Sequence, residues 1–245
     1  MQELARLITE PEPCPYLRGR SSRTDLRLVQ SIEPSEYRDH LREGFRRFGM
    51  MLFRPACEGC RACVPIRVPV DRFRPTKSQR RVMRRNRDVQ VEIGQPAVDA
   101  ERLEVYHAFH EERSARVGWK RQQISAEEYH RTFLQNIVAT AELRYRVAGR
   151  LAAVAYIDLS PEAVNSIYCF HHPDFRRRSL GTFDVLVEIE LARRSGRPHL
   201  YLGFHVADCR SMAYKASFRP AEVLLEGSWR ELEPAAPARW LARGT

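Results

Sequence analysis

Two spacings of apolar residues recur along this 245-residue chain and predict where strands and helices form. Apolar side chains at every second position are typical of strands, because successive side chains in a strand point to opposite faces. This pattern is found at residues 25–31, 50–54, 64–70, 142–148, 151–159, 164–170 and 199–204. Apolar side chains three or four positions apart predict helices that start near residues 34 and 78, and helices at 101–117, 126–139, 179–194 and 207–218.

The order of these elements predicts the fold class. Two helices precede three strands, the first two joined by a turn at Gly149–Arg150, and a helix and a further strand follow. This succession indicates an α+β (mixed α/β) fold containing an antiparallel meander. The stretch GQPAVDA (94–100) has the composition of a linker. It predicts a basic, cysteine-containing N-terminal domain in residues 1–95 and a C-terminal domain in residues 96–245.

An excess of basic residues narrows the class of partner. The chain contains 41 Lys and Arg residues against 31 Asp and Glu residues, with a net charge of +10 and a pI near 9.7. This balance favours nucleic acid over a membrane, because no basic helix with a bulky apolar face is found. The N-terminus lacks the apolar core of a signal peptide, and no apolar stretch is long enough to span a bilayer. We therefore predict a cytoplasmic protein without a membrane partner.

Positive charge is most concentrated in residues 71–88, DRFRPTKSQRRVMRRNRD. A helix capped by Ser78 would place four arginines on one face, with Val82 and Met83 on the opposite face. Guanidinium groups arranged in this way suit the phosphates of a nucleic-acid backbone. The alternative is a solvated charged face, but so many like charges on a short helix repel one another unless a partner neutralises them. The predicted contacts with nucleic acid are Arg80, Arg81, Arg84 and Arg85.

A second basic segment, FHHPDFRRRSLGTFDVL (170–186), leads from a strand into a helix. Gly181 allows close approach to the backbone, and the free N–H groups of the first helical turn attract an anion, which Arg176, Arg177 and Arg178 would reinforce. The subpattern Arg178-x-x-Gly181 is similar to the acyl-carrier loop of GNAT-type acyltransferases, which bind a pyrophosphate there. The alternative is an ordinary arginine-rich start of a helix. The order of meander, loop, helix and strand is also the order of the GNAT fold.

Three cysteines follow one another at a spacing of three in CEGCRACVPIRVP (57–69). Without an export signal the compartment is reducing, so a disulfide is disfavoured there. Thiolates are soft ligands, and Cys57, Cys60 and Cys63 would supply three of the four ligands that tetrahedral zinc or an iron–sulfur cluster requires. Reduced free thiols and redox disulfide exchange remain the alternatives.

Four blocks of the sequence resemble the aminoacyl-tRNA–protein transferases, a family that includes bacterial aspartate/glutamate leucyltransferases and eukaryotic arginyltransferases. The blocks are CPYLRGR (14–20), the long segment 44–86 from GFRRFG to RRVMRRN, HPDFRRRSLGTFDVL (172–186) and YLGFHVADCRSMAYKASFRP (201–220). The resemblance implies transfer of an amino acid from its tRNA to proteins that begin with Asp or Glu, which marks them for degradation by the N-end rule. It also implies a GNAT-like fold with a degenerate second GNAT-like unit at the N-terminus.

The resemblance leaves the donor amino acid open between leucine and arginine. Bacterial leucyl enzymes usually carry Tyr-Leu-Gly-Tyr-Trp where this chain has Tyr-Leu-Gly-Phe204-His205, and Gly-Phe with the later Cys209 is closer to the arginyl branch. Leucyl-tRNA is the preferred donor because the triple-cysteine loop has the bacterial form. The resemblance also makes Cys14 the fourth candidate metal ligand, since eukaryotic relatives hold a metal or cluster through N-terminal cysteines.

The chemistry of aminoacyl transfer indicates which residues could act. The aminoacyl ester is already activated, so positioning, proton removal and stabilisation of an oxyanion are the main requirements. In the AYKASFRP block, Tyr214 could donate to the oxyanion or relay a proton, and Lys215 and Arg219 could bind an acidic acceptor side chain. Tyr214 and Lys215 are the predicted catalytic residues. Candidate bases are His171, His172 and His205, although strand-end histidines are more often structural.

Two other classes of protein compete with this reading. A metal-containing RNA-binding protein without catalysis would explain the basic helix and the cysteines, but not the SLGTF and AYKASFRP segments together. An N-acetyltransferase using acetyl-CoA would explain the SLGTF loop, but has no need of so basic a helix. The predicted co-substrate is therefore aminoacyl-tRNA, with proteins that begin with Asp or Glu as acceptors.

Overall fold

The computed structural model of the protein describes residues 1–233, and its centre is a mixed sheet of eight strands. The strand order is β14-β13-β7-β12-β11-β10-β9-β8. All neighbouring pairs are antiparallel except β11 and β12. The bounds are β7 Val64–Pro69, β8 Gln90–Gly94, β9 Thr140–Val147, β10 Arg150–Leu159, β11 Ala163–His171, β12 His199–His205, β13 Glu222–Leu225 and β14 Ser228–Glu231.

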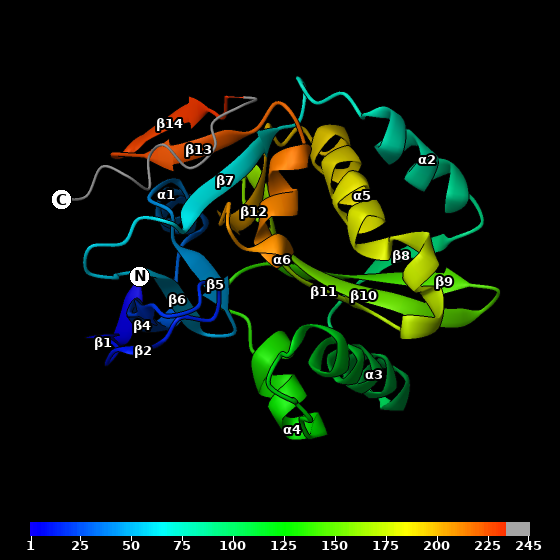
Figure 1. The fold of residues 1–245 in the computed structure, drawn as a ribbon, viewed down its shortest axis with the longest axis horizontal. Coiled ribbons are helices and arrows are strands. Elements are labelled where there is room, and N and C mark those ends of the chain that lie inside the picture. The colour runs from blue at the N-terminus through cyan, green and yellow to red at the C-terminus, as the bar shows by residue number, and fades with distance from the viewer. Residues whose placement is uncertain (234–245) are drawn as a thin grey trace.

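Helices cover both faces of this sheet (Figure 1). On one face lies α5 (Leu180–Arg194), with α2 (Lys77–Arg85) packed beside it. The other face carries α3 (Ala100–Val117), followed by α4 (Ala126–Tyr129) and one π-helical turn, His130–Leu134. The helix α6 (Arg210–Ala213) and a 3-10 turn, Tyr214–Ser217, follow β12.

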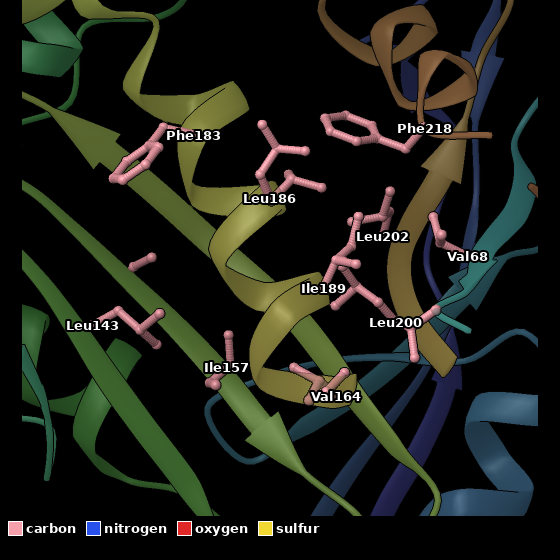
Figure 2. Close-up of a cluster of buried hydrophobic side chains, with 14 of the residues drawn as sticks. Val68, Leu143, Ile157, Val164, Phe183, Leu186, Ile189, Leu200, Leu202 and Phe218 are labelled. Atoms are coloured by element: carbon pink, nitrogen blue, oxygen red, sulfur yellow. The ribbon is translucent and has the colours of Figure 1, made fainter. Parts of the chain in front are cut away.

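The largest hydrophobic core lies between α5 and the sheet (Figure 2). Leu186 and Ile189 of α5 point toward strand residues such as Val164 and Leu200, and all are at most 5 % exposed. A second core, rich in aromatic rings, joins α3 and the π-helical turn to the opposite face. Burial on both faces explains why the central strands read as almost continuous apolar runs.

A smaller sheet of the order β1-β4-β6-β5 lies beside the large one. Its strands are β1 Gln2–Ile8, β4 Thr24–Ser31, β5 Arg46–Phe48 and β6 Met51–Pro55, with α1 (Pro34–Arg42) between β4 and β5; β2 (Glu12–Pro13) and β3 (Ser21–Ser22) form a short hairpin. A buried ion pair ties this region to the large sheet, since Arg47 Nη2 lies 2.5 Å from Asp158 Oδ1.

The mixed α/β fold and the order of meander, loop, helix and strand are confirmed. The predicted division at residue 95 separates segments that share one sheet, because β7 lies between β12 and β13 and β8 pairs with β9. Residues 234–245 of the predicted second part lie outside the described residues.

Several local predictions were wrong. The basic helix is capped by Thr76 rather than Ser78, and its buried face holds Gln79 and Asn86, whereas Met83 is 40 % exposed. Gln79 completes the cap with Thr76 and donates to the carbonyl of Ser217, while Val82 packs against the large core as expected. The helices predicted at 126–139 and 207–218 are shorter than expected.

Candidate active site and nucleic-acid surface

The two parallel strands of the sheet separate along their length. β11 and β12 pair only where Ala163–Asn165 of β11 lie opposite His199–Tyr201 of β12. Just beyond, each strand changes register against its other neighbour, with Ile167 as the extra residue in β11 and Leu202 in β12. Such irregularities re-aim side chains and end strand pairing. Beyond these residues β11 and β12 no longer pair, and the place where they part, between the later residues of the two strands, is called the strand split below.

Arg46, the first residue of β5, occupies the point where the strands part. Its guanidinium donates to the side chain of Asn165 and the carbonyl of Ser166 on β11. The guanidinium also lies against Gly203 of β12. A Cβ atom added at Gly203 would be 3.0 Å from Arg46 Nε. Gly203 has a φ of +81°, which favours glycine. A single guanidinium thus bridges two strands that no longer pair with each other.

Two buried carboxyl groups of α5 face the β11 side of the split. Asp184 accepts a hydrogen bond from the Tyr145 hydroxyl at 2.6 Å and lies beside the Cys169 thiol. Glu188, one turn further along, is fully buried. Burial raises the pKa of both carboxyl groups, and the neighbouring Asp184 raises that of Glu188 further.

Lys215 and Tyr214 lie on the β12 side of the split. The Lys215 ammonium donates to the Phe204 carbonyl at 3.0 Å, and burial, then the charge of Arg46, lowers its pKa to about 7. Tyr214 is 44 % exposed and lies within electrostatic range of Asp184 and Glu188. An amine that is partly neutral near pH 7 can accept a proton, and the Tyr214 hydroxyl, whose pKa is raised by burial, can donate a hydrogen bond.

Of the remaining candidates, His171 and His205 are the last residues of β11 and β12, beside the split, whereas Arg219 and His172 are bonded to backbone groups. Arg219 donates from Nη1 to the Leu232 carbonyl at 3.0 Å. His172 accepts from the Asp174 backbone N–H, so it caps a turn. Burial lowers the pKa of His171 and of His205.

The two predicted arginine clusters form one surface. Arg85 of α2 donates to the Arg177 carbonyl at 2.5 Å, and Arg178 returns a bond to the Arg85 carbonyl at 3.1 Å. Arg178 also forms a bidentate pair with Asp88, both contacts at 2.8 Å. Arg85 and Arg178 therefore hold the segments together, and the exposed arginines of what we call the basic surface are Arg80, Arg81, Arg84, Arg85, Arg176 and Arg177.

The basic surface adjoins the start of α5. Ser179 adopts a left-handed conformation, with φ of +57°, and ends the 3-10 turn Pro173–Arg178 immediately before α5. A Cβ atom added at Gly181 would have no neighbouring atom within 4 Å, so the space beside this glycine is open. The N–H groups of Thr182 and Phe183 already donate to the Ser179 carbonyl, so an anion at the start of α5 would be held by the N–H groups before them together with the exposed arginines.

The predicted cysteine ligands lie near one another but do not form a ligand set. The pKa of the Cys63 thiol is raised to about 12 by burial, and then by Cys14, Cys57 and Cys60. Within residues 1–233, no three His, Cys, Asp or Glu side chains are arranged to hold a metal ion. Cys57 instead contacts the backbone of Arg23, its sulfur 3.4 Å from the nitrogen. The geometry gives zinc or an iron–sulfur cluster no support.

Sequence reasoning missed the groups that define the strand split. Arg46 belongs to a family-like block but reads as an ordinary strand residue, and Asp184 and Glu188 read as polar positions of a helix. One signal was available. Both acids lie on the same side of α5 as Leu180, a core residue, at the i+4 and i+8 positions.

Comparison with known proteins identifies the family of the chain. A family model described as "Arginine-tRNA-protein transferase, N terminus" matches residues 12–81, and one described as "Arginine-tRNA-protein transferase, C terminus" matches residues 101–225. The fold and these matches define an enzyme that transfers aminoacyl groups from tRNA to protein. The chain belongs to the arginine-tRNA-protein transferase family, as its sequence blocks indicated.

Curated relatives extend over nearly the whole chain. An aspartate/glutamate leucyltransferase from Chromohalobacter salexigens is 40 % identical over 238 residues, which is 95 % of each chain. The enzyme of the same name from Chromobacterium violaceum is 36 % identical over 225 residues, 91 % of this chain and 92 % of its own. That from Pseudomonas putida strain W619 is 37 % identical over 233 residues, 94 % and 98 % of the two chains.

Solved structures overlap with the fold in part. The C-terminal domain of a protein described as a lysylphosphatidylglycerol synthetase, from Agrobacterium fabrum, has a TM-score of 0.47 at 15 % identity, covering 82 % of this chain and 64 % of its own. A GCN5-related N-acetyltransferase from Kribbella flavida has a TM-score of 0.34 at 14 % identity, covering 58 % and 48 %. No helix among the described residues combines the length and apolar character needed to cross a bilayer.

Proposed function

We propose that the protein transfers leucine from leucyl-tRNA to the α-amine of proteins that begin with Asp or Glu. The observation that supports this most is the placement of the basic surface beside Gly181, on the helix whose inner face borders the strand split. A tRNA held by its backbone on that surface could reach the split with its aminoacyl end. Near-full-length relatives named aspartate/glutamate leucyltransferase support the choice of donor and acceptors.

Lys215 is the proposed base. The acceptor α-amine reacts in its neutral form, and the Lys215 amine, with a pKa lowered to about 7, can take the proton that this nitrogen loses as it attacks the ester carbonyl. The new C–N bond forms as the C–O bond to the tRNA ribose breaks, and the ribose oxygen takes up a proton. Tyr214, on the β12 side of the split, is proposed to donate a hydrogen bond to the oxyanion.

Arg219 remains the proposed partner for the acidic acceptor side chain. Its Nη1 is bonded to the Leu232 carbonyl, so its other N–H groups would have to receive the carboxylate. An acceptor whose first residue is neutral would lose that contact. Replacement of Arg219 by Gln should therefore reduce the preference for Asp over Ala at the first position.

The proposal is tested by incubating the protein with tRNA charged with labelled leucine or labelled arginine and with peptides that begin with Asp, Glu or Ala. Leucine should appear on the Asp and Glu peptides and not on the Ala peptide. Transfer of arginine alone would reassign the donor. Binding of tRNA without labelled product from either donor would favour an RNA-binding protein without catalysis.

The basic surface is proposed to bind tRNA through Arg80, Arg81, Arg84 and the exposed arginines of the 173–178 turn. Arg178 is proposed to act indirectly, because its guanidinium is bonded to Asp88 and to the Arg85 carbonyl. Arg85, like Arg80, donates to one backbone carbonyl and would contact tRNA through its other N–H groups. The interval between the two matched family models, residues 82–100, contains the predicted linker.

The four N-terminal cysteines are proposed as a thiol site that a metal could use only after rearrangement. The electrostatic coupling of Cys63 to Cys14, Cys57 and Cys60 supports their proximity. Metal analysis of anaerobically purified protein tests it, with Cys60→Ser expected to release any bound zinc or iron. Cys169→Ser is the control, since Cys169 lies beside Asp184 instead. Metal-free, fully active protein would contradict the site.

A further inference from the structure

Glu188 is a buried acid that neither the fold nor the proposed chemistry uses. It is 0 % exposed, and neither carboxylate oxygen has a hydrogen-bond donor at standard geometry among the described residues. The Ser166 hydroxyl and the Arg46 charge favour the ionised form of Glu188, but less strongly than burial disfavours it. A carboxyl group kept in this state costs stability, because an apolar residue of similar size would pack there without desolvating a charge.

We propose that Glu188 binds the α-ammonium group of the aminoacyl ester carried by the donor tRNA. The inference rests on the proposed function, since it names the residue that recognises the donor's amino group. The ligand class is a primary ammonium adjacent to an ester carbonyl.

Position along the strand split supports this assignment. The basic surface and Gly181 mark where the tRNA phosphates would lie, at the start of α5, and Glu188 lies two turns further along the same helix. It borders Ser166, the first residue of β11 after pairing with β12 ends. With the tRNA phosphates at the start of α5, the proposal places the aminoacyl group beside Ser166, next to the last paired residues of β11 and β12.

The nearby cation is not a competing partner for Glu188. The Arg46 guanidinium donates to Asn165 and to the Ser166 carbonyl, and its remaining face lies on Gly203. Asp184 is also engaged, because it accepts from the Tyr145 hydroxyl at 2.6 Å. Among these buried groups Glu188 is the one with unfilled acceptor capacity, and a donor ammonium carries three N–H groups.

Discrimination between two donors tests the assignment. One donor is leucyl-tRNA, and the other is the same tRNA carrying the α-hydroxy analogue, which has a hydroxyl in place of the ammonium. The measured quantity is the ratio of kcat/KM for the two donors with one Asp-starting peptide. Dividing the ratio of a variant by that of the wild type cancels the intrinsic difference in ester reactivity.

The change Glu188→Gln should lower this ratio by about tenfold to a hundredfold, the range for a hydrogen bond to a charged group. Most of the loss should fall on leucyl-tRNA, so residual activity with the hydroxy donor also reports a folded enzyme. Glu190→Gln is the matched control. It removes an acid of the same helix, but one that is exposed and paired with Arg193 and Arg194, and it should leave the ratio unchanged.

A second variant separates recognition from folding. Glu188→Met replaces the acid by an apolar side chain of similar length, so it should melt at or above the wild-type temperature and still lose discrimination. Either variant keeping the wild-type ratio would overturn the inference, as would unfolding of Glu188→Met, which would make the carboxyl structural. A wild type that transfers neither leucine nor arginine would instead overturn the proposed function.

Discussion

The side chain of Arg46 lies directly against the backbone of Gly203, and this contact joins the N-terminal region to the strand split. A Cβ atom on residue 203 would come within 3.0 Å of Arg46 Nε and 3.2 Å of Cζ. The contact therefore fixes how far the guanidinium can approach β12. It also places the charge of Arg46 where it lowers the pKa of Lys215.

Gly203→Ala should displace Arg46 and impair catalysis more than it impairs folding. The new methyl group meets a guanidinium that is 8 % exposed and has little freedom to move, in addition to the strain of a φ of +81°. Gly227→Ala is the matched control, because Gly227 has a φ of +77° but nothing within 4 Å. Both should lose about 1–3 kcal/mol of unfolding free energy through backbone strain. Only Gly203→Ala should lose transfer activity; equal activities would contradict the role of the contact.

The pH dependence of transfer should report Lys215. Because its folded pKa of about 7 lies below the usual value, the amine becomes a competent base as pH rises through 7. The acceptor α-amine also loses its proton, with a pKa of roughly 7.7–8.0. The logarithm of kcat/KM should rise with a limiting slope of two below pH 7. In Lys215→Met the slope should fall to one, and an unchanged slope of two would assign the first ionisation to another group.

Removing charge from the basic surface should weaken tRNA binding and make the binding constant less dependent on salt concentration. The triple change of Arg80, Arg81 and Arg84 to Gln should reduce the slope of log K against log salt by roughly two to three, since each lost phosphate contact contributes about 0.7–0.9. The slope is measured by filter binding at several salt concentrations.

A triple variant of equal charge serves as control for the basic surface. Arg121, Arg194 and Arg230 are 65 %, 77 % and 59 % exposed and lie on other elements. Their change to Gln should leave the salt slope near that of the wild type. If the two triple variants behaved alike, binding would depend on net charge and not on this surface.

Breaking the buried pair of Arg47 and Asp158 should destabilise the protein strongly. Both side chains are at most 1 % exposed, and the Tyr37 hydroxyl and Thr140 hydroxyl also bond to Asp158. Asp158→Asn should cost about 3–5 kcal/mol, because it leaves a buried guanidinium without its counter-charge. Urea denaturation measures the loss. The pair of Arg72 and Glu231 has the same 2.5 Å separation but is more than half exposed, so Glu231→Gln should leave the midpoint unchanged.

Predictions from apolar spacing succeeded where side chains face a core. The strand at 151–159 and the helix at 179–194 differ from β10 and α5 by a single residue at one end, because burial selects apolar side chains along both elements. Strands without buried side chains show no such apolar signal. All seven residues of β1 are exposed, and β8 is exposed at four of five positions, so neither was predicted.

The site was predictable only where a segment is self-contained. The loop before α5 and the AYKASFRP block carry local patterns, and the structure places both near the strand split. Arg46 and Glu188 gain their significance from contacts across long stretches of chain, since Arg46 is bonded to Asn165 and Ser166. Their surroundings depend on tertiary packing that no local period encodes.

The position of β7 affects how the protein is made on the ribosome. Its residues Val64–Pro69 emerge early, yet both of their sheet neighbours, β12 and β13, are translated more than a hundred residues later. At a synthesis rate of about 5–20 residues per second, β7 remains without a partner for on the order of ten seconds. An apolar strand with two open edges is prone to pair with other nascent chains. The nascent enzyme therefore has a window in which a holdase chaperone bound near residue 64 would protect it from aggregation.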